Sequence, residues 1–102
     1  MEYNKLVRDR IPEIIAGQGE KAHIRILEEE EYLRRLEEKL DEEGMEFHEG
    51  KNLEELADIL EVVYALAEAL GASKEELLEI YREKHEKRGG FRDRVFLISK
   101  EG

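Results

Sequence analysis

Proline, the residue that most strongly interrupts a helix, occurs only once in these 102 residues, at position 12. Between its glycines the chain is rich in Leu, Glu, Lys, Arg and Ala, which have high intrinsic helix propensity. Gly50, Gly71 and Gly89 stand where such stretches would end. A chain of this length can bury one small core. We therefore predict a single all-α domain over residues 1–102, an antiparallel bundle of about four helices.

Start and stop signals divide the chain into four helices and two short extended segments. The predicted helices cover residues 10–16, 28–48, 53–70 and 74–88, and the extended segments lie near 21–27 and 94–98. Asp9 is the predicted N-cap of the first helix, whose first turn contains the single proline. Asn52 with Glu55, and Ser73 with Glu76, have the spacing of capping boxes that open the third and fourth helices.

Hydrophobic periodicity indicates which helix faces are buried. The apolar residues of the second helix recur at helical spacing and predict one buried face; they are Leu33, Leu36, Leu40 and Phe47. The third helix is apolar around most of its circumference, so we expect it to be the central, most buried one. The two extended segments are β-prone and are candidates to pair as strands.

The net charge is −10, and residues 28–61 carry most of it, with fifteen acidic and four basic side chains. Such a surface repels a DNA or RNA backbone, so a nucleic-acid polymer is an unfavourable partner, whereas a polyphosphate can bind through intervening cations. There is no cysteine, which excludes thiolate metal sites. Because the chain has neither a membrane-length apolar stretch nor the apolar run of a signal peptide, we expect a soluble cytoplasmic protein without membrane contact.

Four acidic residues have positions that converge if the second and third helices form an antiparallel hairpin. Glu43 and Glu46 are three residues apart, as are Glu55 and Asp58, so each pair shares one face of its helix. A hairpin that turns near Gly50 places Glu46 opposite Glu55, and Glu43 opposite Asp58, because each pair is equidistant from the turn. Two carboxylates about 4 Å apart repel by roughly 4 kcal/mol at an effective dielectric near 20, so such a cluster needs a proton or a cation.

A set of ligands made only of oxygen favours a hard cation, and Mg²⁺ is the ion we expect, with Mn²⁺ bound by the same kind of cluster. The alternative is that these acids form the solvated face of a surface helix, with Glu55 closing its capping box. Glu43 favours the metal site, because it lies in the otherwise apolar row of Leu36, Leu40 and Phe47. A carboxylate that faces a core needs a partner.

Basic residues form a second group of candidate site residues. Lys84 and Arg88 continue the helical row of Leu77 and Tyr81 in the last predicted helix, so an apolar face becomes cationic toward Gly89. They are candidate ligands for the phosphates of a substrate, although cations at a helix C-terminus are also favoured by the helix dipole. Lys5 and Arg8, near the N-terminus, are weaker candidates for the same role.

The acidic pairs also occur within longer motifs. Residues 42–46 (EEGME) and 55–58 (ELAD) resemble the paired Glu-Glu-x-x-Glu and Glu-x-x-Asp motifs of the MazG-like, all-α nucleoside triphosphate pyrophosphohydrolases, a superfamily that includes phosphoribosyl-ATP pyrophosphohydrolase. Residues 3–9 (YNKLVRD) and 87–91 (KRGGF) are similar to a branch labelled phosphoribosyl-ATP pyrophosphohydrolase-like. The resemblance therefore spans nearly the whole chain.

The resemblance implies a hydrolase that converts a nucleoside triphosphate (NTP or dNTP) and water into the monophosphate and pyrophosphate, for the removal of non-canonical nucleotides. It implies an Mg²⁺ site made by Glu43, Glu46, Glu55 and Asp58. Glu42 would be a further contact to metal or water, so that Glu42 and Glu43 are the catalytic candidates. Lys84 and Arg88 would bind phosphate. A homodimer or homotetramer is implied, with helices of two subunits completing the bundle.

One departure from the family concerns the turn. Eight residues separate Glu46 from Glu55, fewer than in many members, which removes material that could contact the substrate. Two other functions remain open. One is hydrolysis of phosphoribosyl-ATP in histidine biosynthesis, and the other is a non-catalytic helical dimerisation module.

Overall fold

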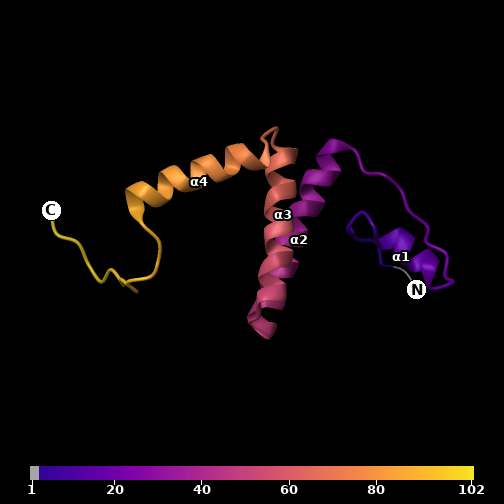
Figure 1. Ribbon diagram of the computed structural model, residues 1–102, viewed down its shortest axis with the longest axis horizontal. Helices are drawn as coiled ribbons and strands as arrows, with labels where there is room; N and C mark the ends of the chain where they lie inside the picture. Colours follow the sequence, from indigo (N-terminus) through magenta and orange to yellow (C-terminus); the bar gives the residue numbers. More distant parts are fainter. Residues whose placement is uncertain (1–2) are drawn as a thin grey trace.

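Four helices make up the regular structure in a computed structural model that describes residues 3–102 (Figure 1). They are α1 (Ile11–Gly17), α2 (Glu29–Gly50), α3 (Leu53–Ala69) and α4 (Lys74–Arg88). The predicted all-α class is confirmed, and each predicted helix is present with boundaries that differ by at most two residues. No strand occurs within residues 3–102.

The helix boundaries follow the local sequence signals at three of the four starts. At α4 the Ser73 side chain accepts a hydrogen bond from the backbone N–H of Glu76, whose carboxylate accepts one from the Ser73 N–H, so this predicted capping box is confirmed. Asn52 caps α3. The prediction of Asp9 as the cap of α1 is wrong, because Arg10 occupies the N-cap position and its side chain makes no capping hydrogen bond. The helix begins at Ile11, and Pro12, which fixes φ near its helical value, lies in the first turn as predicted.

The helices α2 and α3 form an antiparallel hairpin that is the structural centre of the chain (Figure 1). Its core is small: Leu36, Val62 and Ala67 are the buried apolar residues among those that the structure describes. Lys74 places its ammonium group 4.4 Å from the ring centre of Tyr64, at the junction where α4 leaves α3. From there α4 projects away from the hairpin, at the end opposite the turn (Figure 1).

Much of the apolar surface remains uncovered in a single chain. The accessible surface is 9748 Å², whereas a monomeric protein of 12.0 kDa typically exposes about 6,000 Å². The radius of gyration is 18.0 Å, against about 13 Å for a compact domain of this length. The prediction that α3 is the most buried helix therefore holds only for one side. Its other side exposes Leu53 (81%), Leu56 (44%) and Leu60 (48%).

The two segments that the sequence marked as candidate strands have irregular backbone. They do not pair, because residues 21–27 run between α1 and α2 while the tail beyond α4 lies at the opposite end of the molecule (Figure 1). Their apolar side chains are exposed, for example Ile26 at 86% and Val95 at 86%. Among residues 3–102, none of the helices combines the length and hydrophobicity needed to cross a bilayer.

Candidate metal centre

Four carboxylate groups from α2 and α3 meet near the turn of the hairpin. Glu43 and Glu46 come from α2, Glu55 and Asp58 come from α3, and one oxygen atom of each lies within 4.8 Å of the others. The convergence that was predicted from their spacing about the turn is confirmed. A cluster with this geometry could hold a metal ion.

The turn that brings the two pairs together has an unusual backbone. Lys51, not Gly50, takes the left-handed conformation that ends α2 (φ 49°, ψ 46°), and its N–H donates to the carbonyl of Phe47. Gly50 has a different role: a Cβ at this position would lie 3.0 Å from the side-chain nitrogen of Asn52 and 3.3 Å from Cγ of Glu55. Glycine therefore allows the start of α3 to approach the end of α2 closely.

The N-cap of α3 leaves Glu55 available to the cluster. Asn52 Oδ1 accepts a hydrogen bond of 2.9 Å from the backbone N–H of Glu55. The reciprocal bond, in which the Glu55 carboxylate would accept from the Asn52 N–H, is not formed, so only half of the predicted capping box is present. The Glu55 side chain points instead toward the carboxylates of α2. Glu55 therefore serves both the N-cap, through its backbone N–H, and the carboxylate cluster, through its side chain.

Two oxygen atoms in the cluster are buried and have no hydrogen-bond partner among residues 3–102: Oε2 of Glu43 and Oε2 of Glu55. The Glu43 side chain is only 12% exposed. Burial raises the pKa of Glu43, and the neighbouring Glu46 carboxylate raises it further. The pKa of Glu55 is raised by loss of hydration and then by Glu46 and Asp58. These raised pKa values result from lost hydration and from crowded carboxylates that the neighbouring cations do not fully compensate.

Cations surround this site but do not balance its charge. Lys39 lies 3.6 Å from Glu43 and 3.3 Å from Glu42. Arg8 reaches across from the N-terminal segment to Asp58, at 3.2 Å, and its other terminal nitrogen contacts Glu61. With Lys5, which pairs with Glu42, three cations face six carboxylates. The remaining negative charge favours uptake of a cation or of protons.

Glu42, the other predicted catalytic residue, lies beside the four-carboxylate cluster and is not part of it. Its two oxygens accept hydrogen bonds from Lys5 and Lys39, at 3.4 and 3.3 Å. Partial burial alone would raise the pKa of Glu42, but the two ammonium groups lower it below its ordinary value. Glu42 therefore stays ionised, whereas its neighbour Glu43 binds a proton more readily.

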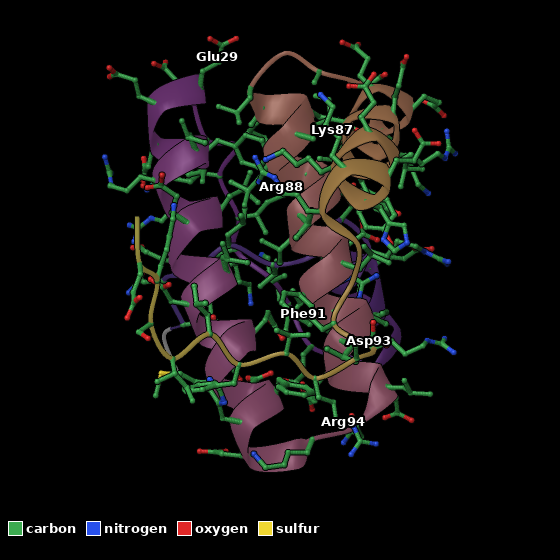
Figure 2. All side chains as sticks on the ribbon, turned by 90° about the vertical axis from the view of Figure 1, so that its left-hand side faces the viewer. Glu29, Lys87, Arg88, Phe91, Asp93 and Arg94 are labelled. Atoms are coloured by element: carbon green, nitrogen blue, oxygen red, sulfur yellow. The ribbon has the colours of Figure 1, made fainter. Side chains whose placement is uncertain are left out.

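The structure brings only some of the predicted phosphate ligands to the site. Lys5 and Arg8 lie beside the acidic residues, as described above. Lys84 and Arg88 lie on α4, which projects from the far end of the hairpin, and neither forms an ion pair within the part of the chain that the structure describes. Figure 2 shows Arg88 at the end of α4 and Phe91 on the tail that follows. In a single chain, α4, which carries both cations, leaves the hairpin at the end opposite the turn, whereas the carboxylate cluster lies near the turn (Figure 1).

Sequence reasoning missed two residues of this site, Lys39 and Glu61. Lys39 precedes Glu42 by three residues and Glu43 by four, which is the spacing that places an ammonium group on the same helix face. Glu61 follows Asp58 by three residues on α3. Both could have been found from these spacings. Arg8 pairs with both Asp58 and Glu61 but lies in a distant part of the sequence. Its contact with these two residues could not have been found from spacing.

The residues present fit a hard divalent cation. All four ligand candidates are carboxylates, two of their oxygens lack any other partner, and no nitrogen or sulfur ligand stands among them. The two helices hold the carboxylates from opposite sides, and the mouth of the site stays accessible because Glu46 is exposed. Such an arrangement could hold a metal ion of this class.

Comparisons with known proteins give a partial likeness. Over 42 residues, the chain is 52% identical to a protein of Mycolicibacterium smegmatis (strain ATCC 700084 / mc(2)155) that is described as uncharacterized. The aligned part covers 41% of this chain and 43% of that relative, so the chain matches less than half of the relative's length. No family model and no solved structure matches this chain. These comparisons assign no function, and a functional conclusion rests on the four carboxylates and their surroundings.

Proposed function

We propose that this chain is an Mg²⁺-dependent nucleoside triphosphate pyrophosphohydrolase, which converts an NTP or dNTP and water into the monophosphate and pyrophosphate. The observation that carries the proposal is the meeting of four carboxylates within 4.8 Å, two of them with a buried oxygen that lacks a partner. The motif resemblance supports the same reaction. Removal of non-canonical nucleotides is the role that we favour for it.

In this proposal the carboxylates of α2 and α3 have separate roles. The four clustered residues would hold the ion, which, when bound, supplies charge neutralisation for the phosphates and acidity for the attacking water. Glu42, kept ionised by Lys39 and Lys5, would accept a hydrogen bond from the attacking water, orient it toward the α-phosphorus and take up its proton. As the new bond from the water oxygen to the α-phosphorus forms, the bond from the α-phosphorus to the bridging oxygen breaks, and pyrophosphate leaves with the electron pair of that bond.

A purely structural role accounts less well for these residues. A dimerisation module gains nothing from Glu43, whose side chain is 12% exposed and whose Oε2 has no partner. Crowded carboxylates destabilise the metal-free fold, and a buried polar atom without a partner costs about 1–3 kcal/mol. Such a cost is expected where a site is built for a ligand.

The uncovered surface supports assembly of the chain with further copies of itself. Its accessible surface exceeds that of a typical monomer of this mass by about 3,700 Å², and an obligate dimer interface removes about 1,000–2,500 Å² from each partner. Leu53, Leu56 and Leu60 form one exposed stripe along α3. We place the interface of a homodimer or homotetramer on this stripe. A second copy would also be the source of Lys84 and Arg88 near the carboxylates.

The enzymatic proposal is tested by incubating the whole chain with a panel of NTPs, dNTPs, modified nucleotides and phosphoribosyl-ATP, with Mg²⁺, and measuring pyrophosphate. We expect release of pyrophosphate and its loss in Glu43→Gln. Glu37→Gln is the matched control, because Glu37 is an exposed acid on the same helix with no ion pair among residues 3–102. A folded protein that hydrolyses none of these substrates would refute the proposal, and preference for phosphoribosyl-ATP would redirect it.

The assembly is tested separately by sedimentation of the purified chain. We expect a dimer or tetramer, and dissociation when Leu56→Glu places a charge in the middle of the α3 stripe. Glu54→Gln, a change at an exposed acidic position on the same helix, should leave the assembly intact. A wild-type monomer at micromolar concentration would contradict the assignment of this stripe.

A further inference from the structure

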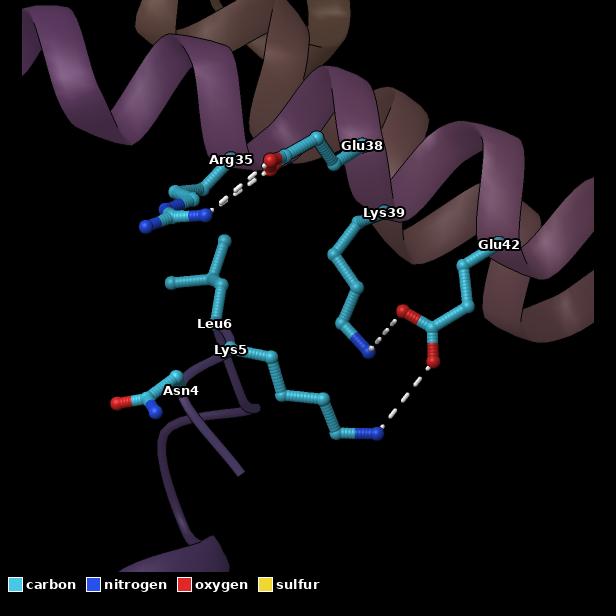
Figure 3. Close-up of a pocket in the computed structure, with 7 residues that line it drawn as sticks. All are labelled: Asn4, Lys5, Leu6, Arg35, Glu38, Lys39 and Glu42. Carbon is cyan, nitrogen blue, oxygen red and sulfur yellow. Dashed lines mark hydrogen bonds and ion pairs between the residues drawn. The ribbon is translucent and has the colours of Figure 1, made fainter. Parts of the chain in front are cut away.

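A pocket of about 290 Å³ lies between the N-terminal segment and α2, next to the acidic cluster (Figure 3). Seven residues line it: Asn4, Lys5, Leu6, Arg35, Glu38, Lys39 and Glu42. Six of the seven are polar or charged, and none is aromatic. Nucleobase and other apolar ligand sites are lined mainly by hydrophobic and aromatic side chains, so the composition of this pocket favours a charged ligand.

Two ammonium groups meet in this pocket on one carboxylate. Lys5 donates to Oε1 of Glu42 at 3.4 Å, and Lys39 donates to Oε2 of the same residue at 3.3 Å (Figure 3). They come from separate parts of the chain, the N-terminal segment and α2. An oxyanion thus lies between two cations, and a phosphate group, which carries more charge and more acceptor oxygens, suits the same pair of donors.

The third cation of the pocket has a different role. Arg35 is held by carboxylates on both sides along its own helix, Glu31 at 3.3 Å and Glu38 at 3.2 Å. Because its guanidinium pairs with these two acids, Arg35 is a structural residue of the pocket lining and not a candidate ligand for an added anion. Among the residues that the structure describes, Lys5 pairs with Glu42 alone, and Lys39 donates a hydrogen bond to Glu42 and lies 3.6 Å from Glu43. Because an ammonium group has three N–H donors, each of these lysines keeps donor capacity for an added anion.

Lys39 connects this pocket to the carboxylate cluster. Its side chain is 17% exposed, and its ammonium group lies 3.6 Å from Glu43 as well as 3.3 Å from Glu42. An anion that is bound by Lys5 and Lys39 would therefore lie beside the cluster that we propose to hold Mg²⁺. A polyphosphate can occupy both places at once, with one phosphate at the ion and the next ones at the lysines.

We propose that this pocket binds the β- and γ-phosphates of the substrate, the part that leaves as pyrophosphate, with Lys5 and Lys39 as their counter-ions. This inference rests on the proposed hydrolase function and names the half of the site that takes the leaving group. Negative charge develops on that group as the bond to the α-phosphorus breaks, and fixed cations beside it stabilise the charge. The nucleoside extends from the α-phosphate in the other direction.

The test uses inorganic pyrophosphate as the probe, titrated into the whole chain in the presence of Mg²⁺ and followed by calorimetry. Lys5→Gln and Lys39→Gln should each weaken pyrophosphate binding about tenfold, the scale of one lost charge-assisted contact. Titrated alone, Mg²⁺ should bind these variants no more weakly than wild type, because each loses a positive charge next to an anionic site. A change that only disturbed the fold would weaken both ligands, and Lys21→Gln, at an exposed lysine outside the pocket, should weaken neither.

Adenosine monophosphate serves as the second probe. Its affinity should change less than that of pyrophosphate in both lysine variants, because its phosphate corresponds to the α-position. Equal pyrophosphate affinity in wild type and both variants, or a larger effect on the monophosphate, would overturn the assignment of the pocket while leaving hydrolysis intact. Absence of hydrolysis in wild type, measured separately, would instead overturn the function on which the assignment rests.

Discussion

Removal of one charge from the carboxylate cluster should stabilise the metal-free protein. Two unit charges 4.8 Å apart repel by about 3.5 kcal/mol at an effective dielectric near 20. Glu43 faces three such neighbours, and Lys39, at 3.6 Å, offsets about one of them. Because Glu46 is exposed and salt screens the rest, we expect Glu43→Gln to raise the free energy of unfolding in EDTA by about 1–2 kcal/mol. That corresponds to a rise of about 5–10 °C in Tm for a domain of this size.

With saturating Mg²⁺, wild type should become more stable than Glu43→Gln, the reverse of the order expected in EDTA. At a hundredfold excess over its Kd, a ligand that binds only the folded state stabilises it by about 2.7 kcal/mol. Wild type should gain this amount, and Glu43→Gln much less, since it has lost a ligand. Thermal unfolding with and without Mg²⁺ measures both effects, and Glu37→Gln is expected to stay within about 0.5 kcal/mol of wild type in each. A variant that is less stable in EDTA, or that gains as much from Mg²⁺ as wild type, would refute the electrostatic reasoning.

The pH dependence has a defined sign. The pKa of Glu43 in the folded protein lies above its ordinary value of 4.5, because burial and Glu46 disfavour the charged form. The favourable contribution of its protonated form is complete below the ordinary pKa and is lost as the pH rises through the raised pKa. Metal-free wild type should therefore lose stability, relative to Glu43→Gln, as the pH rises from about 4.5 to neutrality. A constant difference between the two proteins over this range would contradict the raised pKa.

Three further predictions concern residues around the site. Arg8→Gln removes the cation that pairs with Asp58 at 3.2 Å, so the affinity for Mg²⁺ measured by calorimetry should increase several-fold; a decrease would show that Arg8 is needed to position Asp58. Asn52→Ala removes the N-cap of α3 and should lower the free energy of unfolding by about 1 kcal/mol, with most of the loss recovered in Asn52→Ser; no loss would mean that the cap contributes nothing. The pKa of Glu31 is lowered to about 2, mainly by its hydrogen bond from Arg25. Arg25→Gln should raise it toward 4.5 in an NMR titration, and an unchanged value would assign the shift to other neighbours.

Local signals in the sequence were sufficient to predict the helices and the centre of the candidate site. The capping pair of Ser73 and Glu76 is local, and so are the spacings that place acids on one helix face. The turn near Gly50 then brings the two pairs together by symmetry about the hairpin. These features depend on residues only a few positions apart, or on one connection of two residues, which is why they could be predicted.

Lys39 and Glu61 were missed although their spacings are local, whereas the other missed features depend on contacts between distant parts of the chain. Arg8 contacts Asp58 across fifty positions, and no periodicity predicts that contact. The largely apolar circumference of α3 predicted that it is the central, most buried helix, but α2 covers only one side of it, and Leu56 on the other side remains 44% exposed. Hydrophobic pattern shows that a face needs a partner without showing whether the partner lies in the same chain. The same limit applies to the segment 21–27 and the tail beyond α4, which were predicted as candidate strands and do not pair.

The decisive measurement for a metal site between α2 and α3 is the location of a bound divalent ion. Crystals of the whole chain grown with Mn²⁺ allow the ion to be located by its anomalous scattering. We expect a peak between α2 and α3, about 2.0–2.3 Å from oxygen atoms of Glu43, Glu46, Glu55 and Asp58. An anomalous map without a peak at these carboxylates, in a crystal where the two helices pack as described, would contradict the proposed metal site.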